Sequence, residues 1–273
     1  MGVLLLAWAG FALAAGPASV RKQVEASMLV NGEIEVDAAG KVTRYEIDRR
    51  EKLPEGVRKF VEDSIAGWQF APTLLEGRPV AIRNRMGLLL VAKPIEGGDF
   101  RVELRGTSFY PISEAGYGLE VVHMDPPRYP QNAAQARVSG IVYLVLRIGP
   151  DGKVAEAVAE QVNLRVVAGE MQMKLWRGVL AKSATTRALL WSFRPPQNGE
   201  LADDGSWSLR VPVAYSLQGD GDSYGRWIAY IPGPRQRAPW AEGDDVSPDT
   251  LADGGLYPVG GTGGLRLLSR AGG

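Results

Sequence analysis

Few residues of this chain could perform catalytic or metal chemistry. The 273 residues include one histidine, His123, and no cysteine. A site of several histidines cannot be built from one, and the lack of cysteine excludes disulfides and thiolate metal sites. His123 precedes a proline-rich segment, and we interpret it as a structural or exposed loop residue.

The remaining candidates lack a catalytic spacing. Glu62 and Asp63 are adjacent on the polar face of a predicted helix, which favours solvated carboxylates, although a carboxylate-pair hydrolase stays open. Neither G-x-x-x-x-G-K-[ST] nor G-x-S-x-G occurs, and the glycine-rich stretch 260–264 has no strand before it and no lysine after it. Arg83 and Arg85 alternate along a predicted strand, so they share one face, where they could bind a carboxylate or keep that face hydrated. We therefore predict a protein that is not an enzyme, with no catalytic residue, no cofactor and no metal.

Charge and the N-terminus bear on partners and location. Lys plus Arg and Asp plus Glu are equal at 31 each, so no basic field would attract nucleic acid. Residues 1–20 carry no charged side chain, and the apolar run that begins at Val3 leads into Ala12-Leu13-Ala14, a small-x-small cleavage pattern. This pattern is typical of a secretory signal peptide over residues 1–15. The run is shorter than the roughly 20 residues of a spanning helix. We expect an exported, periplasmic protein, with a retained inner-membrane anchor as the alternative.

Two segments share one order of predicted elements. In the first, strands around 34–36 and 42–47 flank a turn at Gly40, a helix starts near Pro54, and a strand covers 80–92. In the second, strands at 142–148 and 154–162 precede a long helix over 173–191 and a last strand over 207–215. Both segments therefore read strand, strand, helix, strand.

Short motifs recur at matching places in the two segments. Gly-Lys-Val stands at 40–42 and again at 152–154, and Trp-x-Phe-x-Pro stands at 68–72 and 191–195. Together with the shared element order, they indicate a diverged internal repeat. A Trp and a Phe each bury roughly 150–250 Å². We predict that Trp68 and Trp191 are core residues that fix the end of each helix against a sheet, rather than a surface for stacking a ligand.

The second segment resembles the TonB C-terminal domain. Pro127-Arg128-Tyr129-Pro130, Val138-Ser139-Gly140, Pro150-Asp151-Gly152-Lys153-Val154 and Trp191-Ser192-Phe193-Arg194-Pro195 follow one another in the family's order. The match covers 126–217, and 24–93 resembles the same domain as a diverged copy. The resemblance implies an α+β fold of two β-β-α-β units, each a small antiparallel sheet with helices on one face. Residues 94–125 would be a linker, and 218–273 an irregular tail that is mobile or straps the surface.

The resemblance also implies a function. Domains of this family bind a short extended peptide of outer-membrane transporters at a sheet edge, which is β-augmentation. It places the partner-binding edge on the last strand, at Trp207, Leu209, Val211, Val213 and Tyr215, and the same strand could instead pair with a second copy in a homodimer. The chain has no proline-rich spacer. We expect a cell-envelope protein that binds extended segments of envelope proteins, such as TonB-dependent outer-membrane receptors. The alternative is an inner-membrane-anchored TonB-like energy transducer.

Overall fold

The computed structural model describes residues 20, 23–75, 77–94, 100–112, 118–198, 202, 204–217, 224–241, 246–251, 255–259 and 265–268. The predicted signal peptide over 1–15 and the glycine-rich stretch 260–264 lie outside these residues. In the described part, no helix has both the length and the apolar character that a membrane crossing requires.

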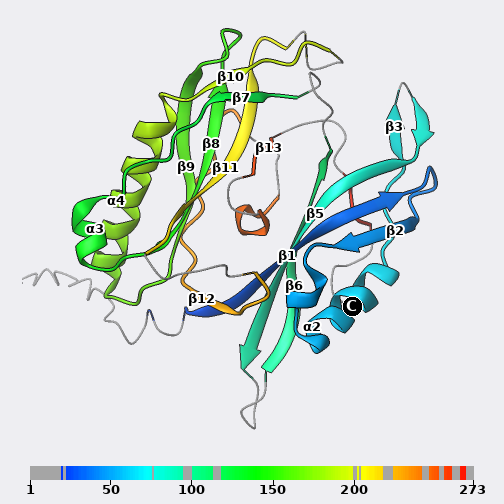
Figure 1. The fold of residues 1–273 in the computed structure, drawn as a ribbon, viewed down its shortest axis with the longest axis horizontal. Coiled ribbons are helices and arrows are strands. Elements are labelled where there is room, and N and C mark those ends of the chain that lie inside the picture. The colour runs from blue at the N-terminus through cyan, green and yellow to red at the C-terminus, as the bar shows by residue number, and fades with distance from the viewer. Residues whose placement is uncertain are drawn as a thin grey trace, which may run out of the picture.

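The described chain is a mixed α+β fold in which every pair of named strands is antiparallel, as predicted (Figure 1). The helices are η1 (Arg50–Lys52), α2 (Glu55–Ala66), α3 (Gln131–Gln135), α4 (Glu170–Ala188) and η3 (Pro248–Thr250). The strands are β1 (Glu25–Val36), β2 (Val42–Ile47), β3 (Thr73–Leu75), β4 (Arg78–Val80), β5 (Ile82–Pro94), β6 (Phe100–Pro111), β7 (Glu120–His123), β8 (Gly140–Ile148), β9 (Val154–Leu164), β10 (Ser192–Arg194), β11 (Trp207–Tyr215), β12 (Ile228–Tyr230) and β13 (Tyr257–Pro258).

The first sheet is built around β1. One edge of β1 pairs with β5 over eleven positions, and its other edge pairs with β2 and, nearer the N-terminus, with β12. Strand β6 continues the sheet beyond β5. Alternate residues of β1 are buried, and they pack with the apolar face of α2, including Val57, Val61 and Ile65. The period-two burial in β1 and the helical spacing in α2 therefore make one core.

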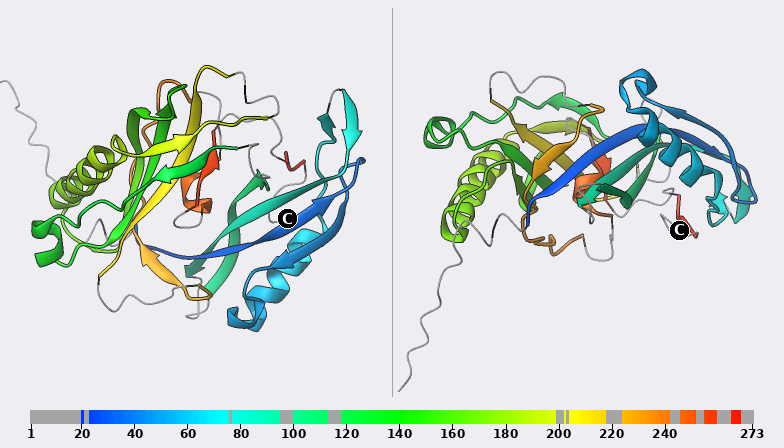
Figure 2. Two further views of the ribbon diagram at one scale, coloured as in Figure 1. Left: turned by 45° about the horizontal axis from the view of Figure 1, so that its top comes forward. Right: turned by 90° about the horizontal axis from the view of Figure 1, so that it is seen from below.

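The second sheet has the order β13-β11-β8-β9, and α4 covers one of its faces. Met173, Leu180 and Ala184 of α4 are buried against the alternate apolar residues of β8. Helices α2 and α4 lie on the outer sides of the molecule, and the opposite faces of the two sheets are turned toward each other (Figures 1 and 2). The segment that contains η3 and β13 runs between the sheets.

The tryptophans predicted to be core residues are buried, which confirms that prediction. Trp68 is 6% exposed and Trp191 is 3% exposed. The ring of Trp68 meets Phe70 and Phe109 edge-on, with centroids 6.1 and 5.6 Å away. Trp191 also donates from Nε1 to the carbonyl oxygen of Asp125 at 2.8 Å. Each ring holds the C-terminal end of its helix against the sheet.

Strand β6 is longer than the sequence pattern indicates. The sequence suggested a strand only over 99–106, inside a predicted linker. In the structure β6 reaches Pro111 and pairs with β5 at eleven positions. Gly106 lies inside this strand at a close contact, since a Cβ there would lie 2.9 Å from the side chain of Thr250 in η3. The segment 94–125 therefore contributes a strand to the first sheet.

The described part of the C-terminal tail is a strap across both sheets. It pairs with β1 through β12, and Ile231 then bridges to Leu164 in β9. Further on, β13 pairs with β11, and Leu267 bridges to Phe70 beside the first sheet. Figure 2 shows β12 alongside the start of β1 in both views. The tail thus alternates between the two halves of the molecule.

Candidate functional site

The five residues predicted as the partner-binding edge all lie on β11, and their side chains are buried. Their exposed fractions are 7% for Trp207, 3% for Leu209, 1% for Val211, 8% for Val213 and 2% for Tyr215. They belong to the core beneath α4, and the Tyr215 hydroxyl donates to the carbonyl of Leu180 at 3.3 Å. A partner that pairs with this edge would therefore not contact these five side chains.

The main chain of β11 presents alternate residues to its outer edge. The Ser208 carbonyl accepts from the N–H of Val259 at 3.0 Å, so Ser208 faces away from β8. In an antiparallel ladder the direction of the N–H and C=O groups alternates from one residue to the next. Arg210, Pro212 and Ala214 therefore face outward too, while the five predicted residues pair with β8. Pro212 has no N–H, and this position costs the β8 ladder nothing.

Part of the outer edge of β11 is occupied by β13. Leu209 pairs with Pro258 and Arg210 with Tyr257. The ring of Tyr257 packs on Tyr110 of β6 with centroids 4.8 Å apart. Among the described residues no strand pairs with the rest of this edge, and Ala214 at its far end is exposed. The strand keeps a partly open edge next to a short strand of its own chain.

A buried ion cluster ties the tail to the same sheet. Arg210 is 0% exposed and Glu160 of β9 is 2% exposed, and Arg210 Nε lies 2.6 Å from Glu160 Oε2. Arg235 of the tail brings Nη2 to 2.8 Å from Glu160 Oε1. Buried charges need such partners because their desolvation is costly. The sequence interpretation missed this cluster, and the available signal was an arginine inside an otherwise apolar strand.

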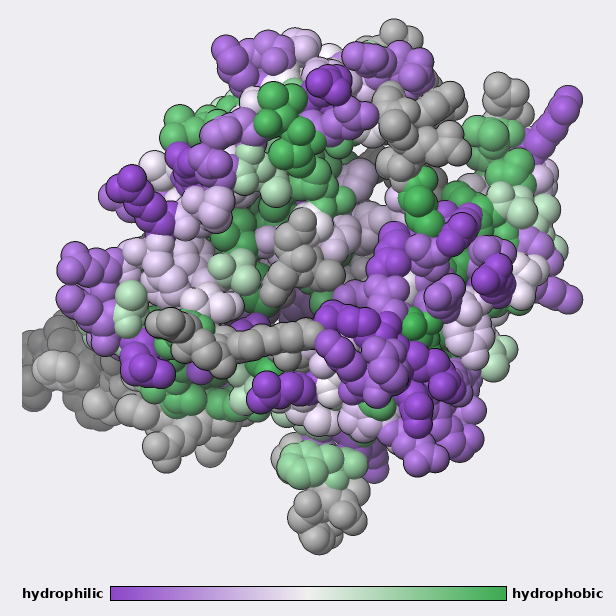
Figure 3. Space-filling view, viewed as in Figure 1, coloured by the Kyte–Doolittle hydropathy of each residue, from purple (hydrophilic) through white to green (hydrophobic). Residues whose placement is uncertain are grey.

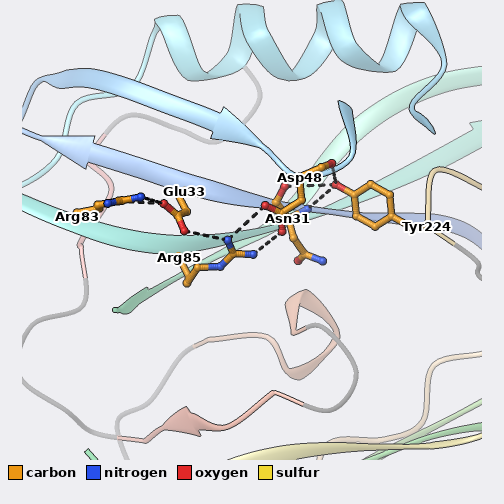
Figure 4. Close-up of polar contacts among 6 residues, drawn as sticks. All are labelled: Asn31, Glu33, Asp48, Arg83, Arg85 and Tyr224. Carbon is orange, nitrogen blue, oxygen red and sulfur yellow. Dashed lines mark hydrogen bonds and ion pairs between the residues drawn. The ribbon is translucent and has the colours of Figure 1, made fainter. Parts of the chain in front are cut away.

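Arg83 and Arg85 share one face of the first sheet, as predicted, on the side away from α2 (Figure 4). There they pair with carboxylates of their own chain. Arg83 Nε is 2.9 Å from Glu33 Oε2, and Arg85 bridges Glu33 and Asp48. The hydrogen bond from Arg83 is the main reason that the pKa of Glu33 lies below its ordinary value. The hydrogen bond to Asp48 likewise raises the pKa of Arg85.

The tail reaches this ion network through Tyr224. Its hydroxyl donates to the Asp48 carbonyl at 2.6 Å, and the Arg49 guanidinium lies 4.0 Å above its ring centroid. The two arginines therefore serve an internal network that also fixes the strap. The alternative role was to bind a carboxylate of another molecule. In the described chain, both guanidinium groups are already paired with carboxylates of the same chain.

The side chains that could take part in catalysis or bind a metal do not lie together in one site. His123 lies on β7, half exposed, with Nε2 3.4 Å from Asp125 Oδ2. Glu62 and Asp63 pair with Arg50 and Lys59 on the exposed face of α2. Within the described ranges no three His, Cys, Asp or Glu side chains gather as a metal site.

Apolar side chains reach solvent at one region of the second half. Val121 and Val122 on β7 are 47% and 61% exposed, and Leu189 and Leu190 after α4 are 48% and 61% exposed. In Figure 3 hydrophilic residues dominate over α2 and β2, while apolar residues are more frequent over the second sheet. Scattered exposed apolar residues are ordinary on protein surfaces.

Comparison of the chain with protein-family models, with curated proteins and with solved structures found no match.

Proposed function

We propose that this chain is a non-enzymatic, exported cell-envelope protein with two TonB-C-like units, and that it binds extended peptide segments at β11. The observation that carries the proposal is a shared backbone contact. In each half the Phe of the Trp-x-Phe-x-Pro motif donates its backbone N–H to the carbonyl oxygen of a hairpin glycine. The distance is 2.8 Å from Phe70 to Gly40 and 2.7 Å from Phe193 to Gly152. Both glycines have positive φ, 82° and 76°.

The order of strands supports the same correspondence. The first sheet contains β2-β1-β5 and the second contains β9-β8-β11, each with a helix on one face. In this alignment β5 corresponds to β11. The outer edge of β5 pairs with β6 at eleven positions, whereas among the described residues the outer edge of β11 pairs with β13 at two positions. We infer one partner edge per chain, in the second unit.

The chemistry of this edge suits an extended main chain. Ser208, Arg210 and Ala214 turn N–H and C=O outward, and Pro212 turns only its C=O outward. A strand added here would gain main-chain hydrogen bonds, and it would contact few side chains of β11. By resemblance, the partner class is the extended segments of envelope proteins, among them TonB-dependent outer-membrane receptors.

Titration with peptides tests the proposal. Synthetic extended segments of TonB-dependent receptors would be added to the full chain and to Ala214→Pro, which removes one outward N–H. We expect Ala214→Pro to bind about tenfold more weakly. The control Ala214→Gly keeps the N–H and should bind as the parent does. If no receptor segment binds the parent, the proposal fails. Binding that Ala214→Pro leaves unchanged would move the site away from β11.

The anchored energy transducer is the second candidate, and it requires that the uncharged stretch 1–20 is retained in the membrane rather than cleaved. Sequencing the N-terminus of the native protein separates the two readings. A mature chain that starts near Ala15 would eliminate the anchor, and an intact Met1 in the membrane fraction would support it. Capture of only the chain itself from an envelope extract would instead favour a homodimer.

A further inference from the structure

The edge assigned to a partner already holds a segment of this chain. Residues 255–259 (Gly-Leu-Tyr-Pro-Val) lie antiparallel to β11, with Arg210 opposite Tyr257 and Leu209 opposite Pro258. We propose that this segment is an internal pseudo-ligand, and that the partner of β11 is an extended peptide of the same pattern, small–x–aromatic–Pro–aliphatic. This inference rests on the proposed function of β11.

The aromatic position is defined by two contacts of its ring. Tyr257 packs on Tyr110 with centroids 4.8 Å apart, and its ring lies over Gly255. A Cβ at Gly255 would come within 2.4 Å of the Tyr257 hydroxyl oxygen and 2.5 Å of Cζ. A larger residue there would require the end of the Tyr257 side chain to shift away from position 255. The observed position of the ring therefore fits a small residue two positions before the aromatic one.

The two flanking apolar side chains also have defined surroundings. Leu256 packs against the core beneath α4, and Val259 packs with Val145 and Trp240 on the opposite side of the sheet. Alternate residues of a strand point to opposite faces. The outer edge of β11 thus offers apolar contacts on each face to an added strand, and those contacts supply selectivity where main-chain bonds cannot.

Proline fits the fourth position for a main-chain reason. The N–H of Val259 points at β11, because it donates to Ser208 at 3.0 Å. By alternation the nitrogen of Pro258 points away from β11, so no ladder bond is lost there. Its missing N–H also gives the outer side of β13 no donor for a further strand, which protects an exposed edge.

The internal segment is held weakly enough to be replaced. It pairs at two positions, whereas β6 pairs with β5 at eleven. An intramolecular segment and a partner that need the same groups exclude each other, so a partner binds only in the fraction of molecules whose edge is open. Weakening β13 should therefore increase the apparent affinity for a partner without altering β11.

The test uses Val259→Pro in the full chain, which deletes the N–H that binds Ser208, and Val259→Ala as the matched control that keeps it. A labelled peptide Gly-Leu-Tyr-Pro-Val serves as the probe. We expect Val259→Pro to bind the probe about tenfold more tightly than the parent, since one main-chain hydrogen bond and its ladder are lost. The amide of Arg210 should also exchange with solvent about tenfold faster. A probe with Ala for Tyr should bind about tenfold more weakly.

The outcomes separate this inference from the proposed function. Equal binding of the probe to Val259→Pro and to Val259→Ala, or unchanged exchange at Arg210, would overturn the pseudo-ligand. Receptor segments that bind the parent and Val259→Pro equally would leave the proposed function standing and still overturn the inference. If only Gly-Leu-Tyr-Pro-Val binds, the pseudo-ligand stands and the receptor assignment falls.

Discussion

At the scale of single residues, the molecule uses one backbone device twice. Gly40 and Gly152 take positive φ at the hairpin turn, and a Cβ at either position would lie 2.0 Å from the carbonyl oxygen of the following motif's Phe. Only glycine combines that conformation with so close an approach. The recurrence of the glycine in Gly-Lys-Val is thus explained by its contact with the Phe of Trp-x-Phe-x-Pro.

Replacing the turn glycine Gly152 should lower stability, whereas replacing a glycine outside the turn should not. Gly152→Ala should lower the free energy of unfolding by about 2–3 kcal/mol, from backbone strain and the clash with Phe193. Gly178 lies exposed in α4 with nothing within 4 Å of an added Cβ. Gly178→Ala should raise stability by about 0.5–1 kcal/mol. Urea unfolding of both variants measures the difference, and equal effects would contradict the turn contact.

The two tryptophans should respond differently to the same change. Trp191 donates from Nε1 to Asp125, whereas Nε1 of Trp68 is buried with no partner among the described residues. Trp→Phe removes the indole N–H at either position. We expect Trp191→Phe to cost about 1 kcal/mol more than Trp68→Phe, which is the worth of one hydrogen bond. Denaturant melts of the two variants decide this, and a larger loss at Trp68 would refute it.

At the scale of elements, helices and hairpins were predictable and edges were not. The apolar period of α2 and α4 and the glycine turns fix those elements locally, and β11 begins at Trp207 and ends at Tyr215 as expected. The extent of β6 depends on pairing with β5, which is set by tertiary contact rather than by local pattern. Only part of the candidate site could be predicted from the sequence. Sequence pattern indicated the strand, but the choice of outward residues needed the position of Val259.

The ion pairs on the face of the first sheet that lies away from α2 should make a small, pH-dependent contribution to the free energy of unfolding. The pKa of Glu33 is lowered chiefly by Arg83, so its stabilising effect is complete above the ordinary value of 4.5 and is lost as pH falls through the lowered value. The Arg83 side chain is largely exposed, so solvent screening keeps the contribution of the pair small. Arg83→Gln should therefore destabilise at neutral pH and have less effect in acid.

Urea unfolding at about pH 7 and about pH 3 measures this dependence. Lys59→Gln is the control, because its pair with Asp63 is more exposed, at 77% and 66%. A loss for Arg83→Gln that is larger in acid than at neutral pH would reverse the expected sign.

At the scale of the whole molecule, the tail joins two sheets that share no ladder. Within the described residues, no strand of the β1 sheet is hydrogen-bonded to a strand of the β8 sheet. The strap instead reaches β1, β9, β11 and Phe70 in turn. The C-terminal region 218–273 was predicted as mobile or as a strap. Composition alone could not decide between the two, because the strap is held by single aromatic and main-chain contacts.

Removing the strap should uncouple the halves. A chain that ends at residue 217 loses β12, η3 and β13, and it leaves Glu160 without Arg235. We expect its unfolding midpoint to fall, because the β12 and β13 pairings and the Arg235–Glu160 ion pair are lost. Its melt should separate into two steps, because the described strands of the two sheets share no ladder. A chain that ends at residue 268 is the control. A single transition at the parent's midpoint would show that the halves are coupled by other contacts.

The position of β12 has a consequence for the order of events during synthesis. Tyr230 contacts Glu25 across 205 residues of sequence. The first sheet therefore cannot finish until most of the chain has left the ribosome, and the N-terminal part of one edge of β1 stays unpaired in the meantime. Distant contacts of this kind slow folding and leave strand edges open to other chains. Nascent polypeptides of this protein should accordingly depend on chaperones that shield the first ninety or so residues.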